Sequence, residues 1–279
     1  MAIDTGIPRQ IINRRAMETH VAAEYTNDID TIMSTISEPP RYALIRRGEP
    51  LTIFEDAAGP RLLYTDWRAS YSCLDSRETR VVTSDWYVFQ ESVTFFRHKG
   101  EFEGVDRTGT EYVIPYAVFV PVREPGRIVG EFVWGRRSVP DSIRAAVDGV
   151  GMPAVPVEGS IAALEVHDRI VDVLRKGTVD ELADIFAADA RLAARDLDDP
   201  QARFHQASGG AEIVGYYRRL LGGQPPQELE VVQLVANDWY VFAEHRLRPA
   251  SGVTISSASI LAFDDAGALV AQIGWSPDV

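Results

Sequence analysis

Two stretches of the chain read almost alike: SDWYVFQE at Ser84–Glu91 and NDWYVFAE at Asn237–Glu244, 153 positions apart. Both run tryptophan, tyrosine, valine and phenylalanine together, residue types that favour a β-strand. Alternate side chains of a strand share a face, so Tyr87, Phe89 and Glu91 should point to one side of a sheet. The opposite side then takes Trp86, Val88 and Gln90. Because both copies keep the apolar part, its simplest role is a strand that packs each core or pairs the two sheets.

The sequence around the two stretches also matches, in the same order. NDIDTIMSTI begins at Asn27 and GTVDELADIF at Gly177, each with an aspartate inside an apolar run of helical period. GRIVGEFVW begins at Gly126 and GALVAQIGW at Gly267, and the first copy holds 12 more residues before this landmark. Three landmarks that recur in one order predict two copies of one domain.

The segment between the copies is predicted to be a linker. SVPDSIRAAVDGVGMPAVPVEGS, residues 138–160, is rich in glycine, proline and valine, with a short helix expected near Ile143–Val147. The sequence therefore predicts a first domain over residues 1–137, which we expect to be catalytic. It predicts a second domain over residues 161–279, a degenerate copy that supports the fold or an assembly.

Each copy predicts the same order of elements: a helix, a shorter helix, a strand, a helix and several strands. The expected positions are helices at 9–25 and 161–175, strands at 41–46 and 190–197, and helices at 61–73 and 211–221. DRTG at 106–109 and PASG at 249–252 are expected hairpin turns. Helices on one face of a curved antiparallel sheet make an α+β domain, a cone whose open mouth is a natural apolar pocket.

The composition argues against some classes of partner. The chain is 46% hydrophobic and 25% charged, and its net charge of −13 argues against nucleic acid and against an anionic membrane surface. The single cysteine, Cys73, allows no internal disulfide, and the N-terminus has no apolar leader, so we expect a cytoplasmic protein. His-x-His, HExxH, GxGxxG and GxSxG motifs are absent from the sequence, so we expect no metal and no cofactor.

Each half resembles the nuclear transport factor 2-like, or SnoaL-like, superfamily. The resemblance rests on HVAAEYTNDIDTIMSTISEPPRY and GRIVGEFVWGRR in the first half, and on VDELADIFAADARLAARD, GAEIVGYYRRL and NDWYVFAEHR in the second. It implies two tandem cone-shaped domains in a protein that forms dimers or trimers. Members include ketosteroid isomerases, scytalone dehydratase, limonene epoxide hydrolase, polyketide cyclases and plain binding domains, so the fold does not fix the reaction.

The resemblance implies where catalytic side chains lie. In ketosteroid isomerases a tyrosine stands eight residues before the acidic start of the second helix, a place taken here by His20 and in the second half by Ile170. The fifth residue after the glycine of the last landmark points into the pocket, which is Glu131 here and Gln272 in the second half. Desolvation favours the protonated form of a carboxyl group, so we expect Glu131 to act as acid or base and His20 to shuttle the proton.

Other pocket positions depart from the isomerase pattern. The isomerase base falls on Leu44, and the second acid of several relatives falls near Val118, so that mechanism is not expected. Alternation places Tyr42 and Arg46 on the face of Leu44, and Tyr116 on the face of Val118. We expect these three side chains to hold substrate oxygens.

Four further residues are expected to contact the substrate: Glu91, Phe89, His98 and Trp134. His98 lies in the region where the first copy is longer than the second. No spacing that suggests a site links the histidines of the second half, His167, His205 and His245.

These residues predict a cofactor-independent lyase in the first half, working by general acid–base catalysis on a small hydrophobic or aromatic alcohol or diol. Dehydration and retro-aldol loss of formaldehyde share this chemistry, and the superfamily includes a formaldehyde lyase that acts on lignin-derived diarylpropane diols. One alternative is an epoxide hydrolase or polyketide cyclase that uses Glu91, Glu131 and Arg46. Another is a non-enzymatic module in which both cones bind a small molecule or a partner.

Overall fold

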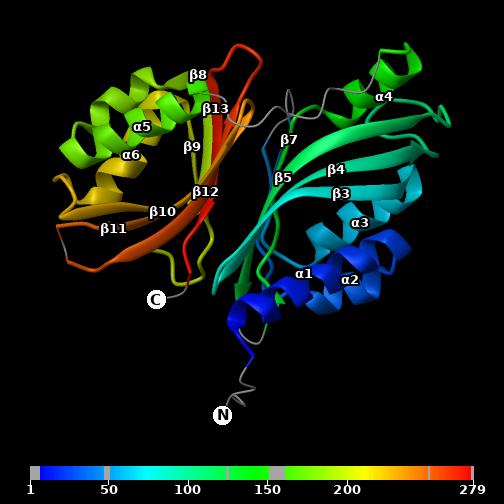
Figure 1. Cartoon of the computed structure of the whole chain (residues 1–279), viewed down its shortest axis with the longest axis horizontal. Coiled ribbons are helices and arrows are strands. Elements are labelled where there is room, and N and C mark those ends of the chain that lie inside the picture. Colours follow the sequence, from blue (N-terminus) through cyan, green and yellow to red (C-terminus); the bar gives the residue numbers. More distant parts are fainter. Residues whose placement is uncertain (1–6, 47–50, 124–125, 151–160, 251, 278–279) are drawn as a thin grey trace. The chain divides into compact units, whose positions relative to one another are not determined.

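The computed structural model describes residues 7–46, 51–123, 126–150, 161–250 and 252–277. The chain divides into two compact units, Met1–Val155 and Pro156–Val279, each with its own sheet and helices (Figure 1). This confirms the α+β class and the tandem repeat expected from the sequence.

The first unit combines a mixed sheet with helices on one of its faces (Figure 1). Its elements are α1 (Arg9–Thr26), α2 (Ile29–Thr35), β1 (Tyr42–Arg46), β2 (Thr52–Phe54), α3 (Ala58–Ser70), β3 (Tyr71–Thr83), β4 (Tyr87–His98), β5 (Glu111–Arg123), β6 (Arg127–Ile128), β7 (Phe132–Gly135) and α4 (Val139–Val147). The strands lie in the order β2-β1-β7-β5-β4-β3, with β6 paired to β5. The DRTG turn lies between β4 and β5, as expected.

Helix α1 turns one side toward the protein interior. Its buried residues are spaced by three or four positions: Asn13, Met17, His20 and Ala23. The helix ends at Asn27, whose φ of 54° is left-handed, and α2 begins at once because the Asp28 side chain accepts a hydrogen bond from the Thr31 backbone N–H. This tight α1–α2 corner holds His20 on the inner side of α1.

Helix α3 differs from the helix expected at residues 61–73. It begins earlier, at Ala58, and it ends at Ser70, so Cys73 belongs to β3. Tyr71 is extended because its ring packs edge-on against Phe96 on β4, with centroids 4.9 Å apart. The strand thus begins where an aromatic contact with the sheet becomes available.

The second unit repeats this path. Its elements are α5 (Ile161–Lys176), the 3-10 helix η1 (Val179–Asp184), β8 (Phe186–Arg195), β9 (Phe204–Ser208), α6 (Gly209–Leu221), β10 (Glu228–Asn237), β11 (Tyr240–Arg248), β12 (Ile255–Phe263) and β13 (Leu269–Trp275). The strand order β10-β11-β12-β13-β8-β9 matches β3-β4-β5-β7-β1-β2 of the first unit. Strand β8 begins earlier than the expected residue 190, because Phe186 is already buried in the core.

The strand registers fix which residues of the two units are equivalent. In both units the last strand pairs in parallel with the first strand: Phe132 meets Ala43, and Ile273 meets Ala193. The residues just before Phe132 and Ile273 are therefore equivalent, as the glycine landmarks predicted. The repeated sequence forms β4 and β11, and its tyrosine and phenylalanine are fully buried in both units.

The first part of the expected linker is a helix of the first unit. Helix α4 begins at an N-cap formed by Ser138, and its Val139 and Ile143 are buried in a cluster with Tyr71 and Phe96. Residues 138–147 therefore do not act as a linker, and the short helix expected near Ile143 begins four residues earlier. Residues 151–160 lie outside the described part of the chain.

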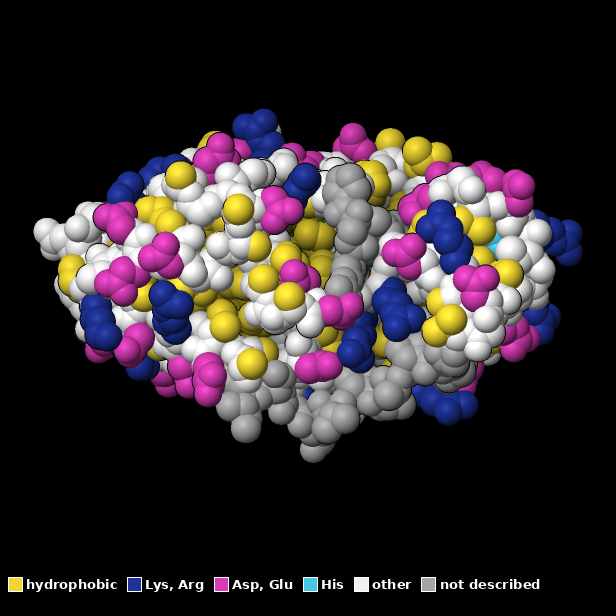
Figure 2. Space-filling view, turned by 90° about the horizontal axis from the view of Figure 1, so that it is seen from above, with side chains coloured by type: hydrophobic (Ala, Val, Ile, Leu, Met, Phe, Trp, Pro, Cys, Tyr) yellow, Lys and Arg dark blue, Asp and Glu magenta, His cyan; other side chains and the backbone are white. Residues whose placement is uncertain are grey.

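Acidic and basic side chains are interspersed on the face that Figure 2 shows. Among the described residues, no helix is long and apolar enough to cross a membrane.

Candidate active site

A cavity of about 140 Å³ lies in the first unit between the helices and the sheet. Aromatic rings form a large part of its wall, contributed by Tyr64, Trp67, Tyr71, Phe96 and Tyr116. Aliphatic side chains add to it, among them Val21, Ile32, Val118 and Val133. The polar groups therefore stand out against an apolar wall, as in most small-molecule sites.

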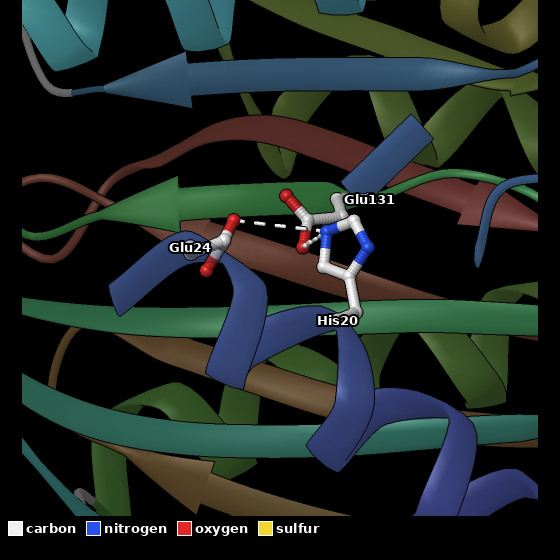
Figure 3. A group of neighbouring side chains, drawn as sticks. All are labelled: His20, Glu24 and Glu131. Carbon is white, nitrogen blue, oxygen red and sulfur yellow. Dashed lines mark ion pairs between the residues drawn. The ribbon is translucent and has the colours of Figure 1, made fainter. Parts of the chain in front are cut away.

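His20 is the centre of the polar group beside this cavity. Its side chain is fully buried, and its Nε2 lies 3.4 Å from Glu131 Oε1 and 3.7 Å from Glu24 Oε1 (Figure 3). His20 and Glu24 are one turn apart on α1, while Glu131 comes from the segment just before β7. Glu24 and Glu131 both line the cavity, so one imidazole nitrogen connects two carboxyl groups that a substrate can reach.

The other imidazole nitrogen is held by Thr35 at the end of α2. His20 Nδ1 lies 2.6 Å from Thr35 Oγ1, and the Thr35 hydroxyl lies 2.6 Å from the backbone oxygen of Ile32. Since that hydroxyl donates its hydrogen to Ile32, its lone pairs accept from the Nδ1–H of His20. In the neutral ring the lone pair is therefore on Nε2, which faces the two carboxyl groups.

Two tyrosines extend the network. The Tyr64 hydroxyl lies 3.0 Å from His20 Nε2 and donates to Glu131 Oε2 at 3.3 Å. The Tyr42 hydroxyl lies 3.3 Å from that of Tyr64. Burial and the charge of Glu131 raise the pKa of both phenols well above the usual value, so both stay neutral hydrogen-bond donors.

The electrostatics give His20 and Glu24, both on α1, different roles. Burial alone would lower the pKa of His20, but the hydrogen bond and charge of Glu131, with the charge of Glu24, outweigh burial and raise it. Burial and the charge of Glu131 raise the pKa of Glu24 to about 8, although His20 and Tyr64 oppose that change. Near neutral pH, Glu24 therefore holds a proton, and the neighbouring carboxyl groups favour the charged form of His20.

The equivalent positions of the second unit are not ionisable. The first helices of both units end at left-handed residues, Asn27 and Gly177, so His20 and Glu24 correspond to Ile170 and Leu174. Gln272 stands in the place of Glu131 and accepts a hydrogen bond of 2.7 Å from the Tyr217 hydroxyl of α6. The tyrosine contact is thus kept in the second unit, and the acid–base groups are not.

Among the catalytic residues predicted from the sequence, His20, Glu131 and Tyr42 meet in one network, and Tyr116 lines the cavity beside it. The Arg46 side chain lies outside the described part of the structure.

Two residues of β4 that were predicted to contact the substrate lie on the face of the sheet away from the cavity. The cavity-lining residues of this strand are Gln90, Ser92, Thr94 and Phe96. Phe89 and Glu91 alternate with them and point away from the cavity, and Glu91 lies 3.6 Å from Arg80 in an ion pair. The prediction that Phe89 and Glu91 bind substrate is therefore corrected, and so is the hydrolase arrangement that relied on Glu91.

Trp134 and His98 are corrected for similar reasons. Trp134 is buried and alternates with Val133, which lines the cavity, so its ring points to the other face of the sheet. His98 ends β4, where its Nδ1 accepts from the Thr108 backbone N–H at 3.3 Å and lies 3.1 Å from the Thr108 hydroxyl. His98 therefore stabilises the connection between β4 and β5 by hydrogen bonding, and it does not line the cavity.

Several residues of this site were not predicted from the sequence, among them Glu24, Thr35, Tyr64, Trp67 and Gln90. The spacing of Glu24 four residues after His20 places both on one side of a helix, a signal that was available. Tyr64 and Trp67 share a side of α3 in the same way. Nothing in the sequence links α3 to β7, which begins at Phe132, far along the chain from the end of α3 at Ser70.

Two histidines of the second unit also meet, although their spacing suggested no site. His167 Nε2 on α5 lies 3.2 Å from His245 Nε2 on β11, beside a cavity of about 60 Å³. Burial, with the charges of His167 and Arg175, lowers the pKa of His245 to about 4. Burial also lowers the pKa of His167, although Asp168 opposes it. Both rings are therefore neutral at neutral pH.

The group of His20, Glu24 and Glu131 also offers the donor types of a divalent-cation site. One donor atom from each residue lies within 4.8 Å of the other two. A cation would have to displace the protons that the raised pKa values of His20 and Glu24 keep in place. Cation binding at this group would therefore release protons and would weaken as the pH falls.

Residues 167–272 match the family model of the SnoaL-like domain. No match to a curated protein was found. Among solved structures, a candidate polyketide cyclase from Xanthomonas campestris pv. campestris is 19% identical with a TM-score of 0.40, over 50% of this chain and 98% of its own. A candidate isomerase from Bacillus subtilis is 17% identical with a TM-score of 0.41, over 52% and 99%. An LEH-like epoxide hydrolase from M. tuberculosis is 14% identical with a TM-score of 0.38, over 50% and 92%.

Proposed function

Residues 167–272 form a SnoaL-like domain whose strand order the first unit shares, and from this premise we propose that the first unit is a cofactor-independent lyase. The substrate is a small alcohol or diol that carries an aromatic ring. The reaction is general acid–base elimination of water, or of water together with formaldehyde.

One observation carries the proposal: His20 Nε2 lies 3.4 Å from Glu131 and 3.7 Å from Glu24, beside an apolar cavity that both carboxyl groups reach. Elimination needs an acid for the leaving hydroxyl and a base for the proton that is lost. Glu24, which holds a proton near neutral pH, can supply the acid, and Glu131 can supply the base. The second unit has the fold and the tyrosine contact without these groups, which supports a chemical role for them in the first unit.

In dehydration, Glu24 gives its proton to the substrate hydroxyl, which leaves as water, while Glu131 takes a proton from the neighbouring carbon and a carbon–carbon double bond forms. The reaction leaves Glu24 charged and Glu131 protonated. His20 then returns the proton from Glu131 to Glu24, because its Nε2 faces both carboxyl groups. Thr35 fixes the ring orientation that this relay needs.

The diol reaction uses the same groups. Glu131 takes the proton of a terminal hydroxyl, the adjacent carbon–carbon bond breaks, and formaldehyde leaves. The electron pair of that bond forms the alkene as Glu24 protonates the second hydroxyl, which departs as water. Tyr64, and through it Tyr42, keeps the Glu131 carboxylate in place by hydrogen bonding.

The size and wall of the cavity support an aromatic substrate. A cavity of about 140 Å³ is close to the ~150 Å³ that holds a benzene ring in an apolar protein interior. Tyr64 and Trp67 present their rings to it at nearly right angles, with centroids 5.6 Å apart, which suits edge-to-face contact with a further ring.

The test is a turnover screen of the purified full chain on aromatic alcohols, diols and epoxides, with alkene, diol and formaldehyde products quantified. Glu24→Gln is expected to lose activity by on the order of 10²-fold, because an amide cannot donate the carboxyl proton. Glu18→Gln is the matched control: it lies on the same helix, is exposed, and pairs with Arg14.

Elimination products from the wild type that Glu24→Gln fails to form support the lyase. Hydration of epoxides without elimination would indicate a hydrolase instead. Binding of these compounds without conversion would contradict the enzyme proposal and favour a binding module.

A further inference from the structure

Arg68, near the end of α3, is the one cationic side chain among the described residues that line the cavity of the first unit. The residue is exposed, and its guanidinium makes no hydrogen bond or ion pair within the described part of the chain. The other arginine of this helix, Arg61, is paired with Asp30 at 3.0 Å. Arg68 therefore brings a positive charge and unused hydrogen-bond donors to the cavity.

One side of α3 connects Arg68 to the acid–base group. Tyr64, Trp67 and Arg68 all line the cavity, and their spacing of three and four residues places them on one side of the helix. Tyr64 contacts His20 and Glu131, so this row begins at the acid–base group. Arg68 follows one helical turn later, a rise of roughly 6 Å. A ligand along this row can therefore reach the reacting groups with one end and the guanidinium with the other.

The second unit shows that the fold does not need an arginine at this place. Tyr64 and Tyr217 are equivalent, because each hydroxyl donates to the side chain just before the last strand or at its middle, at positions 131 and 272. Counted from these tyrosines, Arg68 corresponds to Leu221, which is buried in the hydrophobic core. The arginine thus occurs in the unit that has the acid–base groups, and an apolar residue takes its place in the unit without them.

The chemistry of a guanidinium indicates what Arg68 would bind. Its N–H donors lie in one plane, and two of them match the two oxygens of a carboxylate. We propose that Arg68 binds a carboxylate on the substrate, so that the substrates of this site are aromatic acids that also carry the reacting hydroxyl. This inference rests on the proposed function for the reaction, since it takes the cavity beside Glu24 and Glu131 as the place where substrate binds.

The charge of the whole chain makes this proposal easy to distinguish from a general attraction. The net charge is −13, so the protein as a whole repels an anion. Glu131, which lines the same cavity, adds to this repulsion whenever it is ionised. A preference for an anionic ligand over a neutral ligand of the same shape therefore needs a local cation.

The test compares the binding of p-toluate and p-toluamide to the full chain by titration calorimetry at pH 7 and low ionic strength. The two ligands have nearly the same shape and differ in charge. Wild type is expected to prefer p-toluate. Arg68→Gln should reduce this preference by roughly fivefold, with the affinity for p-toluamide little changed. Arg68→Glu, which places a negative charge there, should reverse the preference.

Arg61→Gln is the matched control, because it removes the same charge from the same helix at a residue that does not line the cavity. It should leave the preference within about twofold of wild type. The proposal is overturned if wild type binds neither ligand or does not prefer p-toluate, or if Arg68→Gln keeps the wild-type preference. An equal loss in Arg61→Gln would also overturn it, because the effect would then be one of net charge.

The readout separates ligand recognition from a structural role of Arg68. A contribution limited to the end of α3 would change the affinity for both ligands alike and leave the preference as it was. The readout is also independent of catalysis, because neither ligand can undergo elimination.

The phenotype of Arg68→Gln and the turnover screen can therefore fail separately. If the preference depends on Arg68 while no alcohol or diol is converted, the carboxylate site stands and the lyase proposal fails. If alcohols are converted while the preference does not depend on Arg68, the lyase stands and the carboxylate site fails.

Discussion

At the scale of single residues, the assignment of roles depends on the raised pKa of Glu24, which keeps its proton near neutral pH. Glu24 lines the cavity and remains partly exposed, with 30% of its side chain accessible, so it can reach a substrate. The His20 side chain is fully buried, and its ring nitrogens lie next to Thr35, Tyr64 and Glu131. We therefore regard Glu24 and Glu131 as the reacting groups and His20 as the group that moves protons between them.

The raised pKa of Glu24 predicts the pH dependence of the reaction. The acid works only while it holds its proton, so kcat is expected to fall as the pH rises through about 8. The fall should approach roughly tenfold per pH unit when a single group is responsible. In Glu24→Gln the residual rate should lack this alkaline fall. A wild-type profile that is flat from pH 7 to 10 would contradict the role of Glu24 as the acid.

The sequence could not show which face of β4 meets the helices. Strand β4 is buried on both faces from Tyr87 to Thr94, so polar and apolar residues do not alternate there. With no such contrast, the sequence places Gln90 and Glu91 on opposite faces but does not tell which face meets the helices. Glu131 and His20 were predicted because the resemblance to a known family places them.

At the scale of elements, the predictable parts are those with a local signal. α1 was expected at 9–25 and runs over Arg9–Thr26, because its buried side chains recur every three or four residues. The boundary between α3 and β3 was missed because Tyr71 leaves the helix for a contact with Phe96, 25 residues away. Helix α4 was assigned to the linker because nearby proline and glycine residues suggested a loop. Its Val139 and Ile143 are buried by packing against side chains of the sheet, which the local sequence does not show.

The contact between α5 and β11 predicts a pH-dependent stability for the second unit. His167 and His245 have lowered pKa values when folded, so between pH 6.5 and about 4 the unfolded chain binds protons that the folded unit does not. The free energy of unfolding is therefore expected to decrease as the pH falls through this window. The contribution of the pair between pH 7 and pH 5 should be about 1–2 kcal/mol.

A double exchange provides the comparison, since the first unit has Met17 and Ser92 at the equivalent positions. His167→Met with His245→Ser should weaken the loss of stability on acidification, measured by urea unfolding of the full chain at pH 7 and pH 5. Equal losses in wild type and double variant would show that the two imidazoles are not the cause.

At the scale of the whole molecule, the chain is a repeat whose halves keep one strand order and differ in their polar interiors. The sequence predicted this repeat well, because three landmarks recur in order and the strand registers align the copies. The contents of each interior were harder to predict, since they combine residues from helices and strands far apart in the chain. The assembly state and substrate identity remain predictions.

The most direct test of a single acid–base site in the first unit uses the equivalent positions Glu131 and Gln272. Activity of the full chain would be measured for wild type, Glu131→Gln and Gln272→Leu with one substrate from the turnover screen. The account predicts a loss on the order of 10²-fold for Glu131→Gln and a change within about twofold for Gln272→Leu. Equal losses in both variants, or full activity in Glu131→Gln, would contradict it.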